Sequence, residues 1–365
     1  MTSEKGGEGV SVGSRTESNA AATAVPARVP VRARGRRTVP ARLWGVIIGL
    51  VIVCAYLTIT TPLFMTWGNL VNIFRAQSVV AILAIGMTFV ILTGGLDLSI
   101  ASLTGLSAML FGLAMQAGWT WIPAVLLCIA VGTFLGMING LLIGWAKISF
   151  FVVTLGTLSI YQSMALLSNS GTTISLFSYK TFTPIQDIAN SSIGPIPVIA
   201  IIVAILYLLA SFVLHYTSFG RAIYATGSNA EAARLNGINV ALILVSTYTI
   251  SGLTGGLGAI QQTGRLTATS PVIDPGLMLT VVAAVLIGGM SLRGGEGGLL
   301  GTLLGVIFLG VIQNGLSLSG VSTFWQGTVT GLILIMAVGL AQLRQTKLRG
   351  KIERYIHRRR AGADG

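Results

Sequence analysis

Ten apolar runs fill most of the chain and constrain its fold more than any other feature. Each is close to the ~20 residues that a helical membrane span requires, and only helices or closed barrels satisfy the backbone within lipid. Only 9% of the 365 residues are charged, against roughly 25% in soluble domains. The sequence therefore predicts an all-α integral membrane protein with about ten transmembrane helices, near residues 43–61, 72–93, 98–117, 121–145, 149–168, 195–214, 240–263, 277–291, 298–316 and 324–343.

The positive charge of the chain is concentrated in two tails. Residues 1–42 hold 8 Lys/Arg against 3 Asp/Glu, and residues 341–365 hold 8 against 2. Cytoplasmic segments of membrane proteins carry an excess of Lys and Arg, so we expect both termini to be cytoplasmic. Ten spans agree with this because an even number returns the chain to its starting side. The same topology places four further basic residues inside, namely Lys147, Arg221, Arg234 and Arg293.

This pattern divides the chain into three regions. Residues 1–42 are predicted to be a disordered, basic cytoplasmic tail, residues 43–343 a transmembrane domain, and residues 344–365 a second basic cytoplasmic tail. Because the tails flank membrane spans, we expect them to contact anionic membrane lipid and not nucleic acid. The first run is interpreted as an uncleaved span, with Arg36-Arg37 as a twin-arginine export signal the alternative.

A polar stretch stands between two membrane-length runs, in a predicted cytoplasmic loop over residues 215–240. Ser228 and Glu231 have the Ser-x-x-Glu spacing of a capping box, and Gly237 suits a left-handed helix stop. The pattern predicts a short helix between them. Such a helix is marginal in water on its own, which favours a partner that packs on it. The residues also fit an ordinary loop helix in which Glu231 is only a cap.

Two Gly-rich stretches interrupt the apolar pattern. Asp97 follows a Gly-Gly pair between two runs, and a carboxyl group there is a candidate functional site. The alternative is that Asp97 caps a restarted helix near the membrane surface. Residues 288–298 form a Gly-rich stretch with Arg293 and Glu296. We interpret it as a flexible cytoplasmic turn, with contact to a cytoplasmic partner as the alternative.

Polar side chains inside the runs are candidates for a translocation path. Each can instead hydrogen-bond a neighbouring helix, which is the commoner role of polar residues in membrane helices. Together with Asp97, these candidates are Asn139, Thr154, Gln162 and Asn314.

Catalytic signatures are missing from the sequence. The pair Gly350-Lys351 is followed by Ile352 where a phosphate-binding loop needs Ser or Thr. His215 and His357 lack the spacing of metal ligands. We therefore predict no catalytic residue, no metal site and no cofactor, and a chain that is not itself an enzyme.

Four ordered motifs carry a resemblance to a known family. Over residues 43–343 the chain resembles the permease subunits of ATP-binding-cassette importers, in the branch that carries ribose and other monosaccharides. The motifs are IGMTFVILTGGLDLSIASL at 85–103, TLGTLSIY at 154–161, FGRAIYATGSNAEAARLNGI at 219–238 and VLIGGMSLRGGEGGLLGT at 285–302.

The resemblance implies partners for the polar stretch. A separate ATPase subunit would bind the ATP and receive a coupling helix with the motif Glu-Ala-Ala-x-x-x-Gly. A second permease chain, identical or different, and an extracellular or periplasmic sugar-binding protein would complete an importer in the plasma membrane. Thr247–Ile250 replace the Ile-x-Leu-Pro found in many permeases. The implied coupling residues are Glu231, Ala232, Ala233 and Gly237, with Ser228 and Arg234 beside them.

Other kinds of membrane protein compete with this interpretation. An ion-coupled secondary transporter would use intramembrane carboxylates, and Asp97 is the one candidate for this role, with Asp274 and Glu296 at the ends of runs. A membrane enzyme would need a nucleophile with its base or a metal site. A channel is disfavoured by the predicted docking helix.

Overall fold

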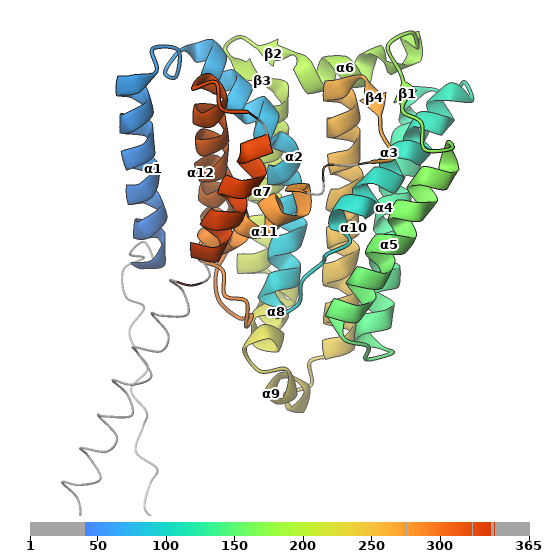
Figure 1. The fold of residues 1–365 in the computed structure, drawn as a ribbon. Helices are drawn as coiled ribbons and strands as arrows, with labels where there is room; N and C mark the ends of the chain where they lie inside the picture. Colours follow the sequence, from blue (N-terminus) through green and yellow to red (C-terminus); the bar gives the residue numbers. More distant parts are fainter. Residues whose placement is uncertain (1–40, 273, 275, 323, 337–338, 340–365) are drawn as a thin grey trace, which may run out of the picture. The chain divides into compact units, whose positions relative to one another are not determined.

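The computed structural model describes residues 41–272, 274, 276–322, 324–336 and 339, and these residues form a helical bundle (Figure 1). Apart from residues 41 and 42, with which the first helix begins, the two predicted tails lie outside the described residues. The elements are α1 (Ala41–Thr60), α2 (Trp67–Leu92), α3 (Ile100–Gln116), α4 (Trp121–Gly144), α5 (Phe150–Ser168), β1 (Ile174–Ser175), the 3-10 helix η1 (Lys180–Phe182), α6 (Thr183–Asn190), β2 (Ser192–Ile193), β3 (Ile196–Pro197), α7 (Val198–Tyr216), α8 (Ser218–Ser228), α9 (Ala230–Leu235), α10 (Val240–Leu266), β4 (Ala268–Thr269), α11 (Gly276–Ile287), α12 (Leu299–Leu318) and a last helix, Phe324–Met336.

All ten predicted runs fall on helices, but ten full-length spans are not confirmed. Within the described residues, seven helices are long and apolar enough to cross a membrane. Three are shorter, namely α3, α11 and Phe324–Met336. The chain is therefore a multi-pass membrane protein.

Two of the short helices adjoin Gly-rich breaks that have the same geometry. After α2, Gly94 adopts φ +84° and its N–H donates to the Ile91 carbonyl at 2.9 Å. After α11, Gly289 adopts φ +87° and its N–H donates to the Leu286 carbonyl at 2.9 Å. A left-handed residue at this position ends a helix and favours glycine. The chain then turns back toward the bundle from the end of α2, and α3 begins within the bundle (Figure 1).

Helices α4 and α10 pack closely against each other through glycine. Gly132 and Gly140 of α4 face the backbone of α10 so closely that an added Cβ would lie 2.6 Å from the Gly252 carbonyl oxygen or 2.7 Å from the Val245 Cα. Small residues four apart allow such approach between membrane helices, where van der Waals contact replaces the hydrophobic effect. The abundant glycine of the sequence thus fixes α10 against α4.

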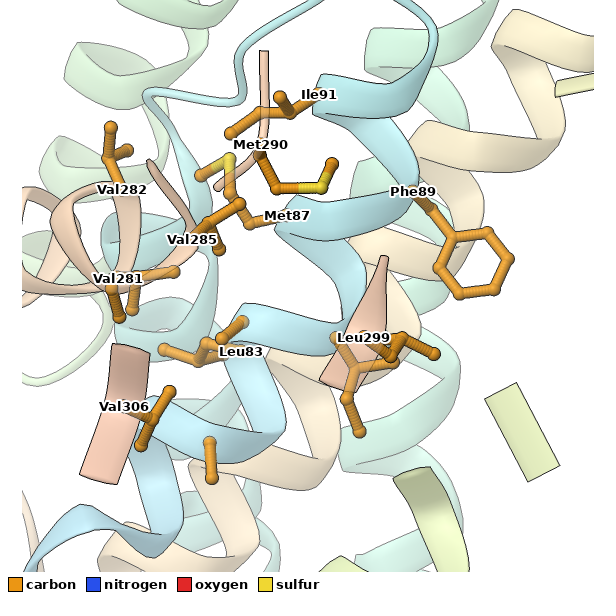
Figure 2. Close-up of a cluster of buried hydrophobic side chains, with 14 of the residues drawn as sticks. Leu83, Met87, Phe89, Ile91, Val281, Val282, Val285, Met290, Leu299 and Val306 are labelled. Carbon is orange, nitrogen blue, oxygen red and sulfur yellow. The ribbon is translucent and has the colours of Figure 1, made fainter. Parts of the chain in front are cut away.

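A second packing centre surrounds α2. Its buried apolar side chains contact those of α7, α11 and α12. Figure 2 shows part of this cluster, including Met87 and Ile91 of α2, Val285 of α11, and Met290, which follows α11. The side chain of Met290 is only 5% exposed, so the segment after α11 is anchored in the core.

Connecting segments gather at the two ends of the bundle (Figure 1). At one end, residues 174–197 form short strands and α6, and β1 pairs antiparallel with β4 after α10. At the opposite end lie the α4–α5 connection, α8 with α9, and the turn between α11 and α12. The predicted cytoplasmic loop 215–240 thus contains two helices, α8 and α9, where the sequence indicated one.

Candidate functional site

Helix α9 projects from the end of the bundle and leaves most of its surface uncovered (Figure 1). Ala233 is its buried residue and faces the bundle. Glu231, Arg234 and Leu235 are exposed, and the Leu235 side chain is 78% exposed. An isolated helix of six residues is far below the length that is stable in water. Its form here therefore depends on its caps and on the contact through Ala233.

The predicted capping box is wrong in its first residue. Ser228 is the last residue of α8, and its hydroxyl donates to the Tyr224 carbonyl at 2.8 Å. Asn229 caps α9 instead, because its side-chain oxygen accepts the Ala232 N–H at 3.0 Å. Ser and Asn are both good N-caps. The position at which α8 ends decides between them, and α8 was not predicted from the sequence.

Glu231 has a different bond from the one that the capping box predicts. Its carboxylate accepts from the Arg234 guanidinium at 2.7 Å, one helical turn away. This hydrogen bond, and then the positive charge of Arg234, hold the pKa of Glu231 below its usual value. Both side chains are about two-thirds exposed, so the pair stabilises α9 only slightly but presents two adjacent charges to a partner.

Gly237 ends α9 as predicted. Its φ is +81°, its N–H donates to the Arg234 carbonyl at 3.0 Å, and the Ile238 N–H donates to the Ala233 carbonyl at 3.1 Å. These are the two bonds of a Schellman motif. Two residues later, Asn239 caps α10 by accepting the Leu242 N–H at 3.1 Å, so α9 leads directly into a long span.

Asp97 lies in the interior of the bundle, in the break between α2 and α3. Its side chain is completely buried, and Ser99 rather than Asp97 occupies the N-cap position of α3. One carboxyl oxygen accepts from the Ser99 N–H at 3.1 Å and the Ser99 hydroxyl at 2.6 Å. The other accepts from the Ser251 hydroxyl of α10 at 2.7 Å. The carboxyl group therefore joins the break to α10.

Asn139 extends this network to α4. Its amide donates to the Ser99 hydroxyl at 2.8 Å, and its oxygen is 3.4 Å from the Tyr161 hydroxyl of α5. Tyr248 of α10, fully buried, donates to the Leu96 carbonyl at 3.1 Å. The network thus holds the α2–α3 break against three helices, and each of these polar groups has a partner, as buried polar groups require.

The other path candidates lie apart from this network. Thr154 is buried and donates to the Phe150 carbonyl of its own helix at 2.8 Å. Gln162 is half-buried and donates to the Pro271 carbonyl at 2.8 Å. Asn314 exchanges two hydrogen bonds with Asn69 of α2, at 2.8 and 2.9 Å.

The path candidates are also absent from the lining of a cavity of about 390 Å³ between α1, α2, α7 and α12. That cavity is apolar except for Gln77, Ser78 and Tyr207. The structure therefore joins Asp97 to Asn139 through Ser99, while Thr154, Gln162 and Asn314 are hydrogen-bonded elsewhere.

The predicted cytoplasmic turn over residues 288–298 has a defined form. Arg293 and Glu296 are both exposed on it. The Ser291 N–H donates to the Glu296 carbonyl at 3.2 Å, and the Gly294 N–H donates to the Ser291 carbonyl at 3.0 Å. These bonds close the turn on itself.

Several residues of this site were missed by reasoning from the sequence. Tyr224 lies on α8 and binds Gly297, Asn229 connects α8 to α9, and Tyr248 and Ser251 complete the network around Asp97. The capping preference of Asn was a usable signal for Asn229. No signal in the sequence indicated Ser251, because it is 154 residues from Asp97 in the chain.

Comparisons with known proteins match nearly the whole described region. Residues 69–338 match the family described as the branched-chain amino acid transport system permease component. The chain is 36% identical over 300 residues to the ribose import permease protein of Escherichia coli, covering 80% of this chain and 91% of that protein. It is 37% identical over 294 residues to the ribose import permease protein of Bacillus subtilis, with the same coverage.

A further relative has a related substrate in its name. The D-allose transport system permease protein of Escherichia coli is 34% identical over 296 residues, which cover 80% of this chain and 89% of that protein. No solved structure matches the chain.

Proposed function

The chain belongs to the branched-chain amino acid transport system permease component family, and within it we propose the permease subunit of an ATP-binding-cassette importer for a monosaccharide. The family description mentions amino acids, but the relatives described above are permeases for ribose and allose. These matches extend over four-fifths of the chain, so the sugar class is the better supported substrate.

The exposed surface of α9 is the observation that supports docking of a separate ATPase subunit. It presents an ion pair, Glu231 with Arg234, beside the exposed apolar side chain of Leu235. Exposed apolar and charged groups on a projecting helix are suited to a groove in a partner. Ser228, Ala232, Ala233 and Gly237 complete the proposed coupling residues, and the buried Ala233 holds α9 against the bundle.

The proposed assembly contains more than this chain. Two permease chains, identical or different, would combine with two ATPase domains that bind the ATP and with a sugar-binding protein outside the cell membrane. Both tails would be cytoplasmic, on the side of α9. The loops that carry Lys147, Arg234 and Arg293 share that end of the bundle, which agrees with the positive-inside rule.

Transport would alternate between inward-open and outward-open states, with ATP binding by the partner shifting the balance. In this structure each proposed path residue described above is hydrogen-bonded to protein. Contact with a sugar therefore requires an exchange of those bonds in another state. Asp97 and Asn139 are proposed to hold the α2–α3 break in position during that exchange.

Charge reversal at α9 tests this function. The permease is co-expressed with the ATPase subunit from its own operon, and the amount of ATPase that co-purifies in detergent is measured. Glu231→Lys is expected to abolish co-purification because it sets two cations side by side in the docking helix. Glu231→Gln keeps the size of the side chain and should retain part of the binding.

Lys180→Glu reverses an exposed charge at the opposite end and is expected to leave co-purification unchanged. Normal ATPase binding by Glu231→Lys would refute the docking role of α9. Sugar uptake that continues without ATP but stops with an uncoupler would instead support the ion-coupled transporter.

A further inference from the structure

The turn between α11 and α12, residues 288–298, lies directly against α8. The Tyr224 hydroxyl of α8 donates to the Gly297 carbonyl at 3.0 Å. A Cβ added to Gly227 would lie 2.5 Å from the Gly295 N, and one added to Gly295 would lie 2.8 Å from the Ser228 N. Here backbone touches backbone, so any movement of the end of α8 displaces the turn.

The same turn contacts the end of α2 on its other side. The Gly295 N–H donates to the Leu92 carbonyl at 2.8 Å. A Cβ added to Gly294 would lie 2.7 Å from the Gly94 N. Gly294 and Gly295 adopt φ +80° and +72°, where other residues are strained. The turn therefore bridges α8 and the last residues of α2.

The turn is also held together by hydrogen bonds of its own and anchored at its start. Its internal bonds join Ser291 to Glu296 and to Gly294. At its start, Met290 is buried beside Met87 and Ile91 of α2 (Figure 2). Because protein cores are close-packed, an anchored turn moves as a unit with its neighbours and does not deform smoothly.

Two connections from α9 meet at the α2–α3 break. One runs through the chain, from Gly237 into α10, whose Tyr248 and Ser251 bind Leu96 and Asp97. The other runs through space, from α8 to Leu92, both directly at Gly227 and through the turn. Both end within a few residues of Asp97.

On the basis of the proposed function, we propose that the α11–α12 turn couples the ATPase-docking helices to the buried break at Asp97. Tyr224, Gly227 and Gly295 are positioning residues in this scheme. When the partner displaces α9, α10 shifts through the chain, and the turn makes the end of α2 shift with it. The break then moves together with α10. The hydrogen bonds of Asp97 are therefore either all kept or all exchanged.

Hydrogen–deuterium exchange of the purified permease–ATPase complex in nanodiscs tests this coupling. Exchange is compared for residues 93–99 and 218–237, without nucleotide and with ATP plus vanadate. In the natural chain, addition of ATP plus vanadate is expected to change the exchange of both segments. Tyr224→Phe removes one neutral hydrogen bond and should reduce the response of 93–99 by about two- to tenfold, while 218–237 still responds.

Two glycine substitutions complete the design. Gly227→Ala pushes α8 away from both Leu92 and Gly295, so it breaks the direct contact as well as the one through the turn and should lose the response of 93–99. Tyr224→Phe changes only the contact with the turn. Gly298→Ala is the matched control on the same turn, because its φ is 173° and its added Cβ would meet only the Tyr224 hydroxyl, at 3.7 Å. The control is expected to respond like the natural chain. If Gly227→Ala does not fold, Tyr224→Phe still tests the coupling, because it adds no atom.

The outcomes separate this inference from the function on which it rests. If 218–237 responds in the natural chain and 93–99 does not, or if Tyr224→Phe leaves the response of 93–99 unchanged, the turn does not couple the two. If the ATPase protects no part of 218–237, the docking site itself is wrong and both proposals fall.

Discussion

Replacing Gly132 by Ala is expected to push α4 and α10 apart. The added methyl group would lie 2.6 Å from the Gly252 carbonyl oxygen and 2.7 Å from the Gly256 N, and both are backbone atoms that no rotamer change can move. Ordinary contact begins near 3.4 Å. The helices must therefore separate by roughly 0.7 Å at this level.

The expected cost follows from two opposing effects. Overpacking a close-packed interface costs about 1–3 kcal/mol. Ala favours the helix over Gly by about 0.5–1 kcal/mol, which offsets part of that cost. We expect Gly132→Ala to lower the free energy of unfolding by about 1–2 kcal/mol.

The measurement is unfolding of the detergent-solubilised permease by sodium dodecyl sulfate, with Gly45→Ala as the matched control. Gly45 is exposed on α1 and an added Cβ meets nothing within 4 Å, so only the helix preference acts there. That control should be neutral or slightly stabilising. A Gly132→Ala variant as stable as Gly45→Ala would show that the α4–α10 contact is not close-packed.

Three further predictions concern the polar groups. Asp97→Ala removes a group that accepts three hydrogen bonds and should lower the free energy of unfolding by about 2–5 kcal/mol in the same assay. Asp97→Asn keeps the shape of the side chain and should lower it less. Equal losses would contradict this reasoning. Asn69→Leu, Asn314→Leu and the double variant form a double-mutant cycle in the same unfolding assay. The two mutual hydrogen bonds should give a coupling free energy of about 1–3 kcal/mol, and additive effects would refute the pairing. Arg234 lowers the pKa of Glu231, so the pair stabilises α9 above the ordinary carboxyl pKa and loses this effect as the pH falls through the lowered value. In Arg234→Ala, the pKa of Glu231 measured by NMR should rise toward the ordinary value. An unchanged pKa would contradict the ion pair.

Features that depend on short stretches of chain were predictable. The apolar runs specified the helices because lipid leaves a backbone few other ways to satisfy its polar groups. The left-handed stop at Gly237 was predictable because a positive φ favours glycine, which is again a property of the local sequence. The N-cap of α9 was not, because Ser228 and Asn229 are both good caps and the choice depends on where α8 ends.

The sequence by itself determined a multi-span helical membrane protein and a short polar helix outside the spans. Only the tertiary structure decided that Asp97 is sealed between the break and α10 and that Asn69 pairs with Asn314. The physical reason is range. Hydrophobic length and helix stops are properties of neighbouring residues, whereas a buried hydrogen bond joins groups whose separation along the chain, 245 residues for Asn69 and Asn314, leaves no trace in either local sequence.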